Sequence, residues 1–315
     1  MDLAHLLWLL LLSAIWGASY MLIKIGVATI EPLTFAMVRV LFGTLTLLGI
    51  ALARRQALPR AARDWGRFAF VGVFNILVPF GAISWGTQHI PSGVAAILNA
   101  TMPLFVFILA VSSGTETLSW VRLGGLLIGF GGIVVLTLPR LEGGLSLGLL
   151  GSLAIVLAAL SYAVATVYAR RHLTGYPPLV ASLGQIGTGW LFLLVASCLF
   201  ERPWAQPLTA GPVAAAAFLG AVGTAVAYLI YYRLVAAVGA TKTSVTTYIV
   251  PLFGVLWGWV ILSERLSWHA FAALGMILVG LVLANDLLGL ARSGAGLDRI
   301  NKMNRIEEQV RRIGS

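Results

Sequence analysis

Residues 103–120 read PLFVFILAVSSGTETLSW, and residues 251–268 read PLFGVLWGWVILSERLSW. Seven of the eighteen aligned positions are identical at a constant offset of 148 residues, from the shared Pro-Leu-Phe start to the shared Leu-Ser-Trp end. Glu116 and Glu264 are the identical acidic pair within the two stretches. A chain that carries this stretch twice is predicted to be a tandem duplication.

The repeat extends well beyond these two stretches. The same offset joins Gly72 to Gly220, while earlier in each half an offset of 146 places Trp16 over Tyr162. The change of two residues falls in a polar loop of each half, where insertions are tolerated. A repeating unit of about 147 residues is far longer than the units of solenoid proteins, so each copy is predicted to be a multi-helix repeat.

The composition identifies lipid as the solvent of this chain. Apolar residues make up 59% of the sequence and charged residues 10%, whereas soluble domains contain roughly 25% charged residues. Apolar runs of about 20 residues recur, and each could cross a hydrocarbon core as a helix. A membrane barrel would instead show short alternating segments. The first run lacks a basic leading region and has a counterpart in the second half, so we expect a permanent helix rather than a signal peptide.

The sequence therefore predicts an all-α polytopic membrane protein with ten transmembrane helices. Breaks are placed where Pro, Gly and charged residues cluster. The predicted helices are residues 5–27, 32–53, 67–88, 92–112, 119–138, 148–169, 178–199, 212–233, 241–262 and 267–287.

Five helices per repeat is an odd number, so the second copy must enter the membrane from the opposite side. The chain is thus predicted to form two inverted five-helix repeats, residues 1–142 and 143–290, followed by a basic cytoplasmic tail, residues 291–315. Transporters with inverted repeats place their substrate site near the midplane, between the repeats.

The distribution of Lys and Arg predicts the orientation. With the N-terminus in the cytoplasm, the inner loops and tail carry sixteen Lys and Arg residues, and the outer loops carry three, Arg140, Arg202 and Arg265. Inner loops are enriched in these residues in membrane proteins. We therefore expect both termini on the cytoplasmic side of a bacterial inner membrane.

These features resemble a known family. The two five-helix repeats, the Trp16-Gly17 step, and the Pro of the fourth and ninth helices followed by Glu look like the EamA branch of the drug/metabolite transporter superfamily. The aromatic amino-acid exporter group is the most similar within it, although Tyr162 stands where a second Trp is commoner. The resemblance implies a central cavity walled by helices 1–4 and 6–9, with helices 5 and 10 at the periphery.

Several polar and aromatic residues are predicted to lie near the midplane, on helices that would form this cavity. For each one alone, hydrogen bonding between helices is the commoner explanation, but the set favours a binding site because a bare polar group in hydrocarbon is costly. The candidate substrate-binding residues are Trp16, Asn75, Phe80, Asn99, Tyr162, Tyr228 and Tyr248.

Pro103 and Pro251 are the candidate hinges, because a proline within a helix removes a backbone hydrogen bond, so a kink or a broken turn is expected at each. A static kink that only shapes the packing is the alternative. Two cations lie within apolar spans. Lys24 is expected to extend towards the headgroups, while Arg39 is expected either to line the cavity mouth or to pack against a carbonyl.

The predicted function follows from the charges that the spans lack. No Asp or Glu is expected at mid-membrane, where an antiporter of protons and drug cations ordinarily needs one. The sequence predicts a secondary transporter that exports small neutral or zwitterionic metabolites, chiefly aromatic or neutral amino acids, by alternating access. The alternatives are a multidrug or phosphorylated-metabolite antiporter of the same superfamily, and a membrane scaffold or enzyme subunit that transports nothing.

The four histidines are scattered and no phosphate-binding glycine loop is present, so no catalytic residue, metal or cofactor is predicted. The expected partners are a small-molecule substrate and membrane lipid, not nucleic acid, with the chain as a monomer or homodimer.

Topology gives the first testable prediction. Both termini should be cytoplasmic, and the loops of Glu116 and Glu264 should face opposite sides of the membrane, because the repeats are inverted. Single cysteines introduced into each loop on a Cys198→Ala background can be labelled with a membrane-impermeant reagent. Labelling of both loops from the same side would contradict the inverted arrangement.

Overall fold

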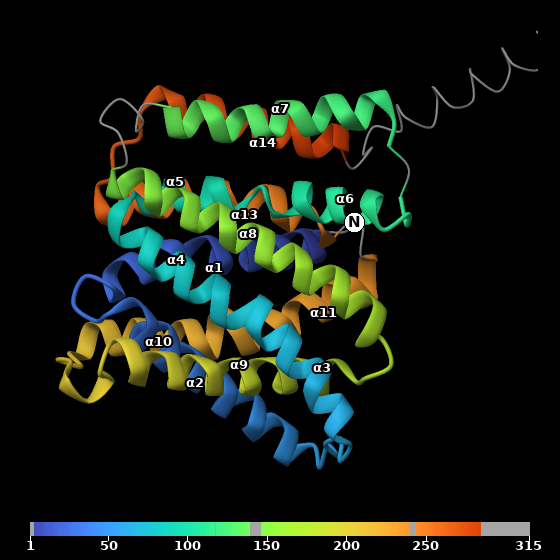
Figure 1. The fold of residues 1–315 in the computed structure, drawn as a ribbon, viewed down its shortest axis with the longest axis vertical. Coiled ribbons are helices and arrows are strands. Elements are labelled where there is room, and N and C mark those ends of the chain that lie inside the picture. Colours follow the sequence, from blue (N-terminus) through green and yellow to red (C-terminus); the bar gives the residue numbers. More distant parts are fainter. Residues whose placement is uncertain (1–2, 117, 139–145, 240–242, 285–315) are drawn as a thin grey trace, which may run out of the picture.

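A computed structural model gives the fold of the chain, and it describes residues 3–116, 118–138, 146–239 and 243–284. The described residues form helices and loops, without strands, and the long helices run side by side (Figure 1). The predicted all-α class is confirmed. The following bounds take the helices in chain order.

The first half contains α1 (Leu3–Gly26), α2 (Pro32–Ala53), α3 (Ala62–Gly72), the π-helix η1 (Val73–Leu77), α4 (Val78–His89), α5 (Ser92–Asn99), α6 (Met102–Ser112) and α7 (Trp120–Thr137). The second half contains α8 (Leu147–His172), α9 (Pro178–Phe200), the 3-10 turn η3 (Pro203–Ala205), α10 (Ala210–Gly220), the π-helix η4 (Ala221–Val226), α11 (Ala227–Val238), α13 (Thr246–Leu262) and α14 (Trp268–Ala284).

Within the described residues, eight helical stretches are long and apolar enough to cross a membrane, and α13 and α14 are two shorter apolar helices. Together they make the ten spans that the sequence predicts. The third span is α3–η1–α4, the fourth is α5–α6, and the eighth is α10–η4–α11. Several ends differ from the predicted ones: the third span begins at Ala62 instead of residue 67, and the eighth continues to Val238 instead of residue 233.

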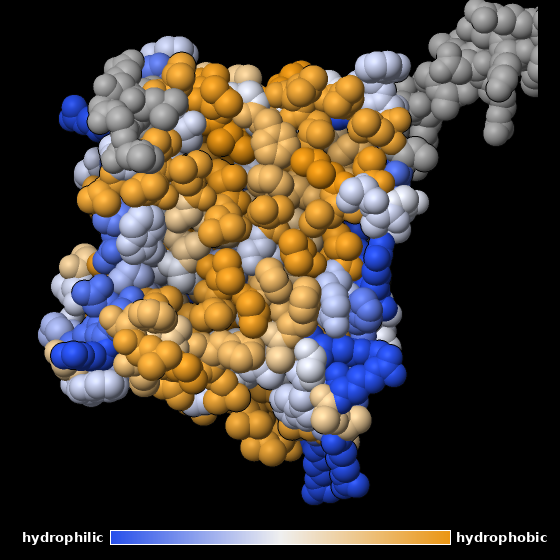
Figure 2. All heavy atoms as spheres, in the orientation of Figure 1, coloured by the Kyte–Doolittle hydropathy of each residue, from blue (hydrophilic) through white to orange (hydrophobic). Residues whose placement is uncertain are grey.

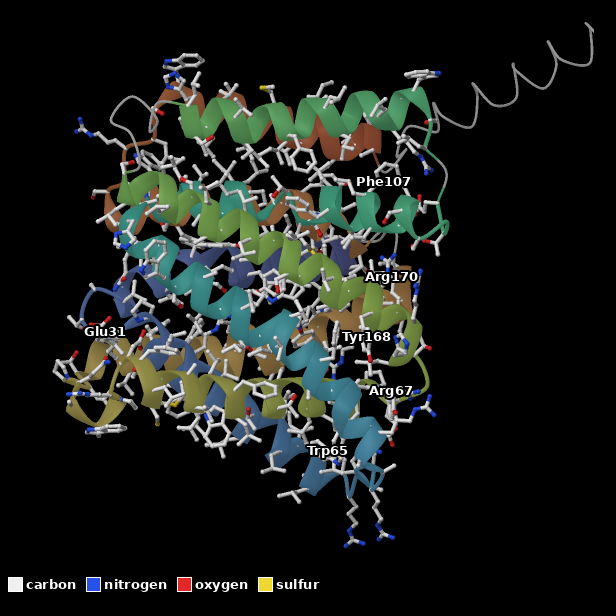
Figure 3. The ribbon with its side chains drawn as sticks, viewed as in Figure 1. Glu31, Trp65, Arg67, Phe107, Tyr168 and Arg170 are labelled. Atoms are coloured by element: carbon white, nitrogen blue, oxygen red, sulfur yellow. The ribbon has the colours of Figure 1, made fainter. Side chains whose placement is uncertain are left out.

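The spans are arranged in layers. The fifth span, α7, packs against the tenth, α14, and the pair forms a separate layer at one side of the molecule (Figure 1). Hydrophobic residues cover the middle of the face shown in Figure 2, and hydrophilic residues gather along its left and right edges. Glu31 lies at one of these edges, while Arg67 and Arg170 lie at the other (Figure 3). This pattern is that of a multi-pass membrane protein.

Glycine contacts reveal the pseudo-two-fold relation between the halves. A Cβ on Gly72 would lie 2.9 Å from the backbone nitrogen of Gly189, and a Cβ on Gly220 would lie 2.8 Å from that of Gly43. Gly72 corresponds to Gly220, and Gly43 to Gly189, in the repeat. The same close approach is therefore made twice with the halves exchanged, once between the third and seventh spans and once between the eighth and second.

The layer of α7 and α14 has the same symmetry. A Cβ on Gly132 would lie 2.9 Å from the Ala273 carbonyl oxygen, and a Cβ on Gly280 would lie 2.6 Å from that of Gly125. Gly132 corresponds to Gly280 in the repeat, and Gly125 corresponds to Ala273, so the two contacts are equivalent. Small residues let two backbones approach closely in a membrane, so these glycines pack helices within the chain.

Carboxylates from the second half cap helices of the first half. Glu201 accepts hydrogen bonds from the backbone N–H groups of Leu33 (2.8 Å) and Thr34 (2.7 Å) at the start of α2. Glu264 accepts from the backbone N–H groups of Ser92 (2.8 Å) and Gly93 (3.2 Å) at the start of α5. The first N–H groups of a helix have no partner within it, and an anion near them is stabilising. These two contacts tie the halves together.

The matching carboxylate Glu116 behaves differently. It accepts a hydrogen bond of 2.8 Å from Nη1 of Arg122, in its own half. The identical residues of the repeated stretch therefore have different partners in this structure.

The two repeat-related prolines also differ in local structure. The fourth span breaks at Ala100 and Thr101, and Pro103 lies in the first turn of α6, where its missing N–H removes no helical hydrogen bond. Pro251 lies inside the continuous helix α13. The break before Pro103 matches the broken turn expected there, whereas α13 continues without a break through Pro251. The hinge role of both residues stays a prediction.

Close packing of α7 on α14 predicts the effect of two matched substitutions in α14. Gly280→Ala places a methyl group against the backbone of α7, and such overpacking costs about 1–3 kcal/mol. A methyl group on Gly275 would meet no neighbouring atom within 4 Å, so Gly275→Ala should leave the melting temperature of the purified protein unchanged. Gly280→Ala should lower it by several degrees. Equal melting temperatures would contradict this packing.

Candidate functional site

A cavity of about 290 Å³ lies in the interior of the protein. Its lining residues come from the first to fourth and the sixth to ninth spans, and none comes from α7 or α14. The cavity is therefore formed between the two halves, as the resemblance implied. The two π-helices border it through Asn75 and Ile76 of η1 and Gly223 and Thr224 of η4.

The π-helices are repeat equivalents. Val73, the first residue of η1, corresponds to Ala221, the first residue of η4. π-Helical turns are rare and are often found at functional sites. The matched glycines, Gly72 and Gly220, immediately precede them and are held against a neighbouring span.

Pro79 leaves one carbonyl group of η1 without a hydrogen-bond donor from its own helix. The backbone N–H of Val78 donates to the Val73 carbonyl, five residues earlier. The next residue, Pro79, has no N–H to donate to the Phe74 carbonyl. The hydroxyl of Ser161 donates to this oxygen instead, at 2.7 Å. A buried carbonyl left without a partner would be costly, so α8 is fixed against the third span here.

A corresponding contact joins the first span to the eighth. Nε1 of Trp16 donates to the carbonyl of Gly223 in η4, at 3.2 Å. Ser161 and Trp16 are each on the first span of a half, and each donates to the π-helix of the other half. The irregular backbone is thus satisfied by side chains from across the repeat interface.

The structure brings six of the seven candidate binding residues to this one cavity. Residues that line it are Trp16, Asn75, Phe80, Asn99, Tyr162 and Tyr228. Tyr248 is not among the lining residues; it packs, partly buried, against the largest hydrophobic cluster. Of the two candidate hinges, Pro251 lines the cavity and Pro103 does not. Whether these residues bind a substrate stays a prediction.

Both asparagines are hydrogen-bonded at the cavity wall. Nδ2 of Asn75 donates to Oε1 of Gln185, at 2.9 Å, and Nδ2 of Asn99 donates to the hydroxyl of Tyr20, at 2.8 Å. Oδ1 of Asn99 is buried and has no hydrogen-bond partner among the described residues. Asn99 is the last residue of α5, directly before the break in the fourth span, so the break brings this unpaired acceptor to the cavity.

Most of the lining residues were not among the candidate binding residues, and two of these, Tyr20 and Arg39, carry polar groups on large side chains. Tyr20 is buried and lies one helical turn after Trp16, a spacing that the sequence could have indicated. Arg39 lines the cavity, which favours the first of its two alternatives, and its place at the mouth stays a prediction. Its guanidinium carbon lies 4.3 Å from the centroid of the Phe80 ring, within the range of a cation–π interaction.

Lys24, the other cation of the spans, has a different environment. Its Nζ donates to the carbonyls of Thr87 (2.7 Å), Ile90 (2.9 Å) and Gln88 (3.4 Å). The last carbonyls of a helix lack partners within it, and a cation there is stabilising. Lys24 therefore fastens α1 to the end of α4 instead of extending freely to the headgroups.

The family model for EamA-like transporters matches the chain twice, at residues 3–138 and 149–285. The chain belongs to the EamA-like transporter family. The boundaries predicted at residues 142 and 143 stay a prediction, and the predicted tail, residues 291–315, lies outside the described residues.

Two relatives of the chain are named as transporters. The uncharacterized inner membrane transporter YedA of Escherichia coli K12 is 31% identical over 275 residues, covering 86% of this chain and 87% of YedA. The uncharacterized transporter YoaV of Bacillus subtilis is 24% identical, covering 88% of this chain and 95% of YoaV. A crystal structure with 19% identity aligns over 91% of this chain and 99% of its own, with a TM-score of 0.63; that likeness concerns the fold.

These comparisons make this EamA-family chain a multi-pass membrane transporter. The comparisons do not show that the chain belongs to the aromatic amino-acid exporter group, so membership of this group stays a prediction. The amino-acid substrate is likewise a prediction.

Adjacent residues of the eighth span allow a test of the cavity. Thr224 lines it, whereas Ala225 is fully buried in a hydrophobic cluster and does not. On a Cys198→Ala background, Thr224→Cys should react with a small water-soluble methanethiosulfonate at least about tenfold faster than Ala225→Cys, because reaction requires access. Faster reaction at position 225 would contradict the assigned lining.

Proposed function

We propose that this transporter exports small neutral or zwitterionic metabolites, with aromatic and other neutral amino acids as the substrate class. The observation that carries the proposal is the lining of the cavity: five aromatic rings and two Asn amides, with no Asp or Glu among the described lining residues. Aromatic rings suit an apolar side chain, and amides suit the polar groups of an amino acid.

The size of the cavity supports the same class. Ligand pockets commonly measure about 300–1,000 Å³, and this cavity of about 290 Å³ is at the low end. A space of this size suits a single amino acid better than an extended drug molecule.

Alternating access is the mechanism that inverted repeats make available. Each half would adopt in turn the conformation that the other has, which moves the opening of the cavity from one side of the membrane to the other. We propose that residues 1–142 and 143–290 are the two units that exchange conformations. The fourth and ninth spans, with Pro103 and Pro251, would supply the hinges.

The proposed orientation has both termini in the cytoplasm of a bacterial inner membrane. The basic edge that contains Arg67 and Arg170 (Figure 3) would then be cytoplasmic, and the edge with Glu31 would face outward. Coupling to protons is not required by the lining, because it offers no described carboxylate to carry one. A facilitator driven by the solute gradient is therefore part of the proposal.

Flux into proteoliposomes tests this function. Radiolabelled phenylalanine, tryptophan and leucine should cross, and the flux should persist when the proton gradient is collapsed. A quaternary ammonium dye whose flux strictly requires the gradient, without amino-acid flux, would favour the multidrug alternative. Flux of a sugar phosphate alone would favour the phosphorylated-metabolite alternative, and no flux of any solute would favour a scaffold.

Variants of the aromatic lining connect the flux to this cavity. Trp16→Ala and Tyr228→Ala should each lower amino-acid flux about tenfold, the effect of roughly 1.4 kcal/mol of lost contact. Trp259 is exposed and lies outside the lining, so Trp259→Ala is the matched control and should transport normally. Unchanged flux in both lining variants, with normal folding, would remove this cavity as the substrate site.

A further inference from the structure

Among the described residues, the guanidinium of Arg39 is a cation without an anion. Its Nε is buried without a hydrogen-bond partner, and its guanidinium lies over the ring of Phe80. The side chain as a whole is only half-buried because it borders the cavity. No described Asp or Glu lines the cavity with it.

Four described carboxylates near the ends of the spans have partners elsewhere, and Glu31 is exposed at the start of α2, outside the cavity lining. Glu201 and Glu264 cap α2 and α5, and Glu116 binds Arg122. Asp64 binds the hydroxyl of Tyr176 and lies 3.9 Å from Arg67. None of these contacts involves Arg39.

The backbone that carries Arg39 is held in place. Its carbonyl oxygen and the backbone nitrogen of Gly43 are the nearest backbone atoms to Gly220, where α2 packs closely on the eighth span. This close contact places the backbone of Arg39 beside the eighth span, which also lines the cavity.

An unpaired charge away from water is energetically unfavourable, and it is usually compensated by an opposite charge or by carbonyl oxygens. Lys24 shows the second solution, with three carbonyls around its Nζ. The face of an aromatic ring compensates a guanidinium only in part. Of these two cations, Arg39 is thus the one whose compensation is incomplete.

We propose that Arg39 binds the carboxylate of the transported molecule. A guanidinium presents paired N–H donors that match the two oxygens of a carboxylate. The single arginine favours one negative charge over the two of a phosphate monoester. The unpaired Oδ1 of Asn99, at the wall of the same cavity, accepts a hydrogen bond from the ammonium group. This inference rests on the proposed amino-acid class and names the residue that selects within it.

Three ligands with the same phenyl ring test the contributions of the carboxylate and the ammonium group separately. Phenylalanine has both groups, 3-phenylpropionate has only the carboxylate, and phenethylamine has only the ammonium. Binding to the purified full-length protein in detergent is measured by calorimetry. The wild-type protein should bind phenylalanine and 3-phenylpropionate, and it should bind phenethylamine at least about tenfold more weakly because the amine repels Arg39.

Arg39→Gln should weaken binding of both carboxylates about 30-fold or more and leave phenethylamine binding unchanged or stronger. Arg39→Lys should restore part of the affinity, since it keeps the charge but not the paired donors. Arg171 is exposed at the end of α8, so Arg171→Gln is the matched control and should bind as the wild type does. Wild-type affinity for phenylalanine in Arg39→Gln would overturn the inference while leaving the amino-acid function intact.

If the wild-type protein binds none of the three ligands, the proposed amino-acid class is wrong. A thermal melt then tests carboxylate binding by Arg39 independently of that class. Benzoate or lactate should raise the melting temperature of the wild type but not that of Arg39→Gln, and inorganic phosphate should have less effect. Without ligand, Arg39→Gln should melt no lower than the wild type, because it removes a charge whose compensation is incomplete. A lower melting temperature of the variant, or no response to any carboxylate, would overturn the inference.

Discussion

Backbone hydrogen bonding in a medium without water is the constraint on which this structure depends. Regular helices satisfy it internally, and irregular backbone is tolerated in a membrane only where protein groups or a cavity satisfy it. The irregular turns of the third, fourth and eighth spans all border the central cavity. Ser161 and Trp16 supply the donors for two of the carbonyls involved. The cavity and the irregular turns are therefore parts of one arrangement.

This arrangement also couples the two halves. The donors at each π-helix come from the other half, the close glycine contacts cross between the halves, and Glu201 and Glu264 cap helices of the first half from the second. The glycine contacts occur in repeat-related pairs, and the contacts at the two π-helices join repeat-related helices through different residues. The caps have no such counterpart, because Glu116 binds Arg122 within its own half. The symmetry is thus close in the interior and is broken at the helix ends.

Much of the candidate site could be predicted, because a buried polar or aromatic residue near the midplane is conspicuous in an apolar sequence. Six of the seven candidate residues line the cavity, including the repeat-related pair Trp16 and Tyr162. Tyr248 does not, because a one-dimensional depth gives no information about which face of α13 points inward. The sequence indicates the depth of Arg39 but not the ring and the cavity beside it, so it cannot choose between the two alternatives for this residue.

Composition, internal similarity and an odd number of helices per repeat were enough to predict that the chain spans a membrane, that it is duplicated and that the copies are inverted. Tertiary structure alone decided where the helices break and which polar groups have partners. The prolines illustrate the difference: Pro103 and Pro251 are equivalent in the sequence, yet one begins a helix and the other lies within one. Local sequence fixes the missing N–H of a proline, but the packing of neighbouring spans determines which group donates to the carbonyl left free, as the Ser161 hydroxyl does for Phe74.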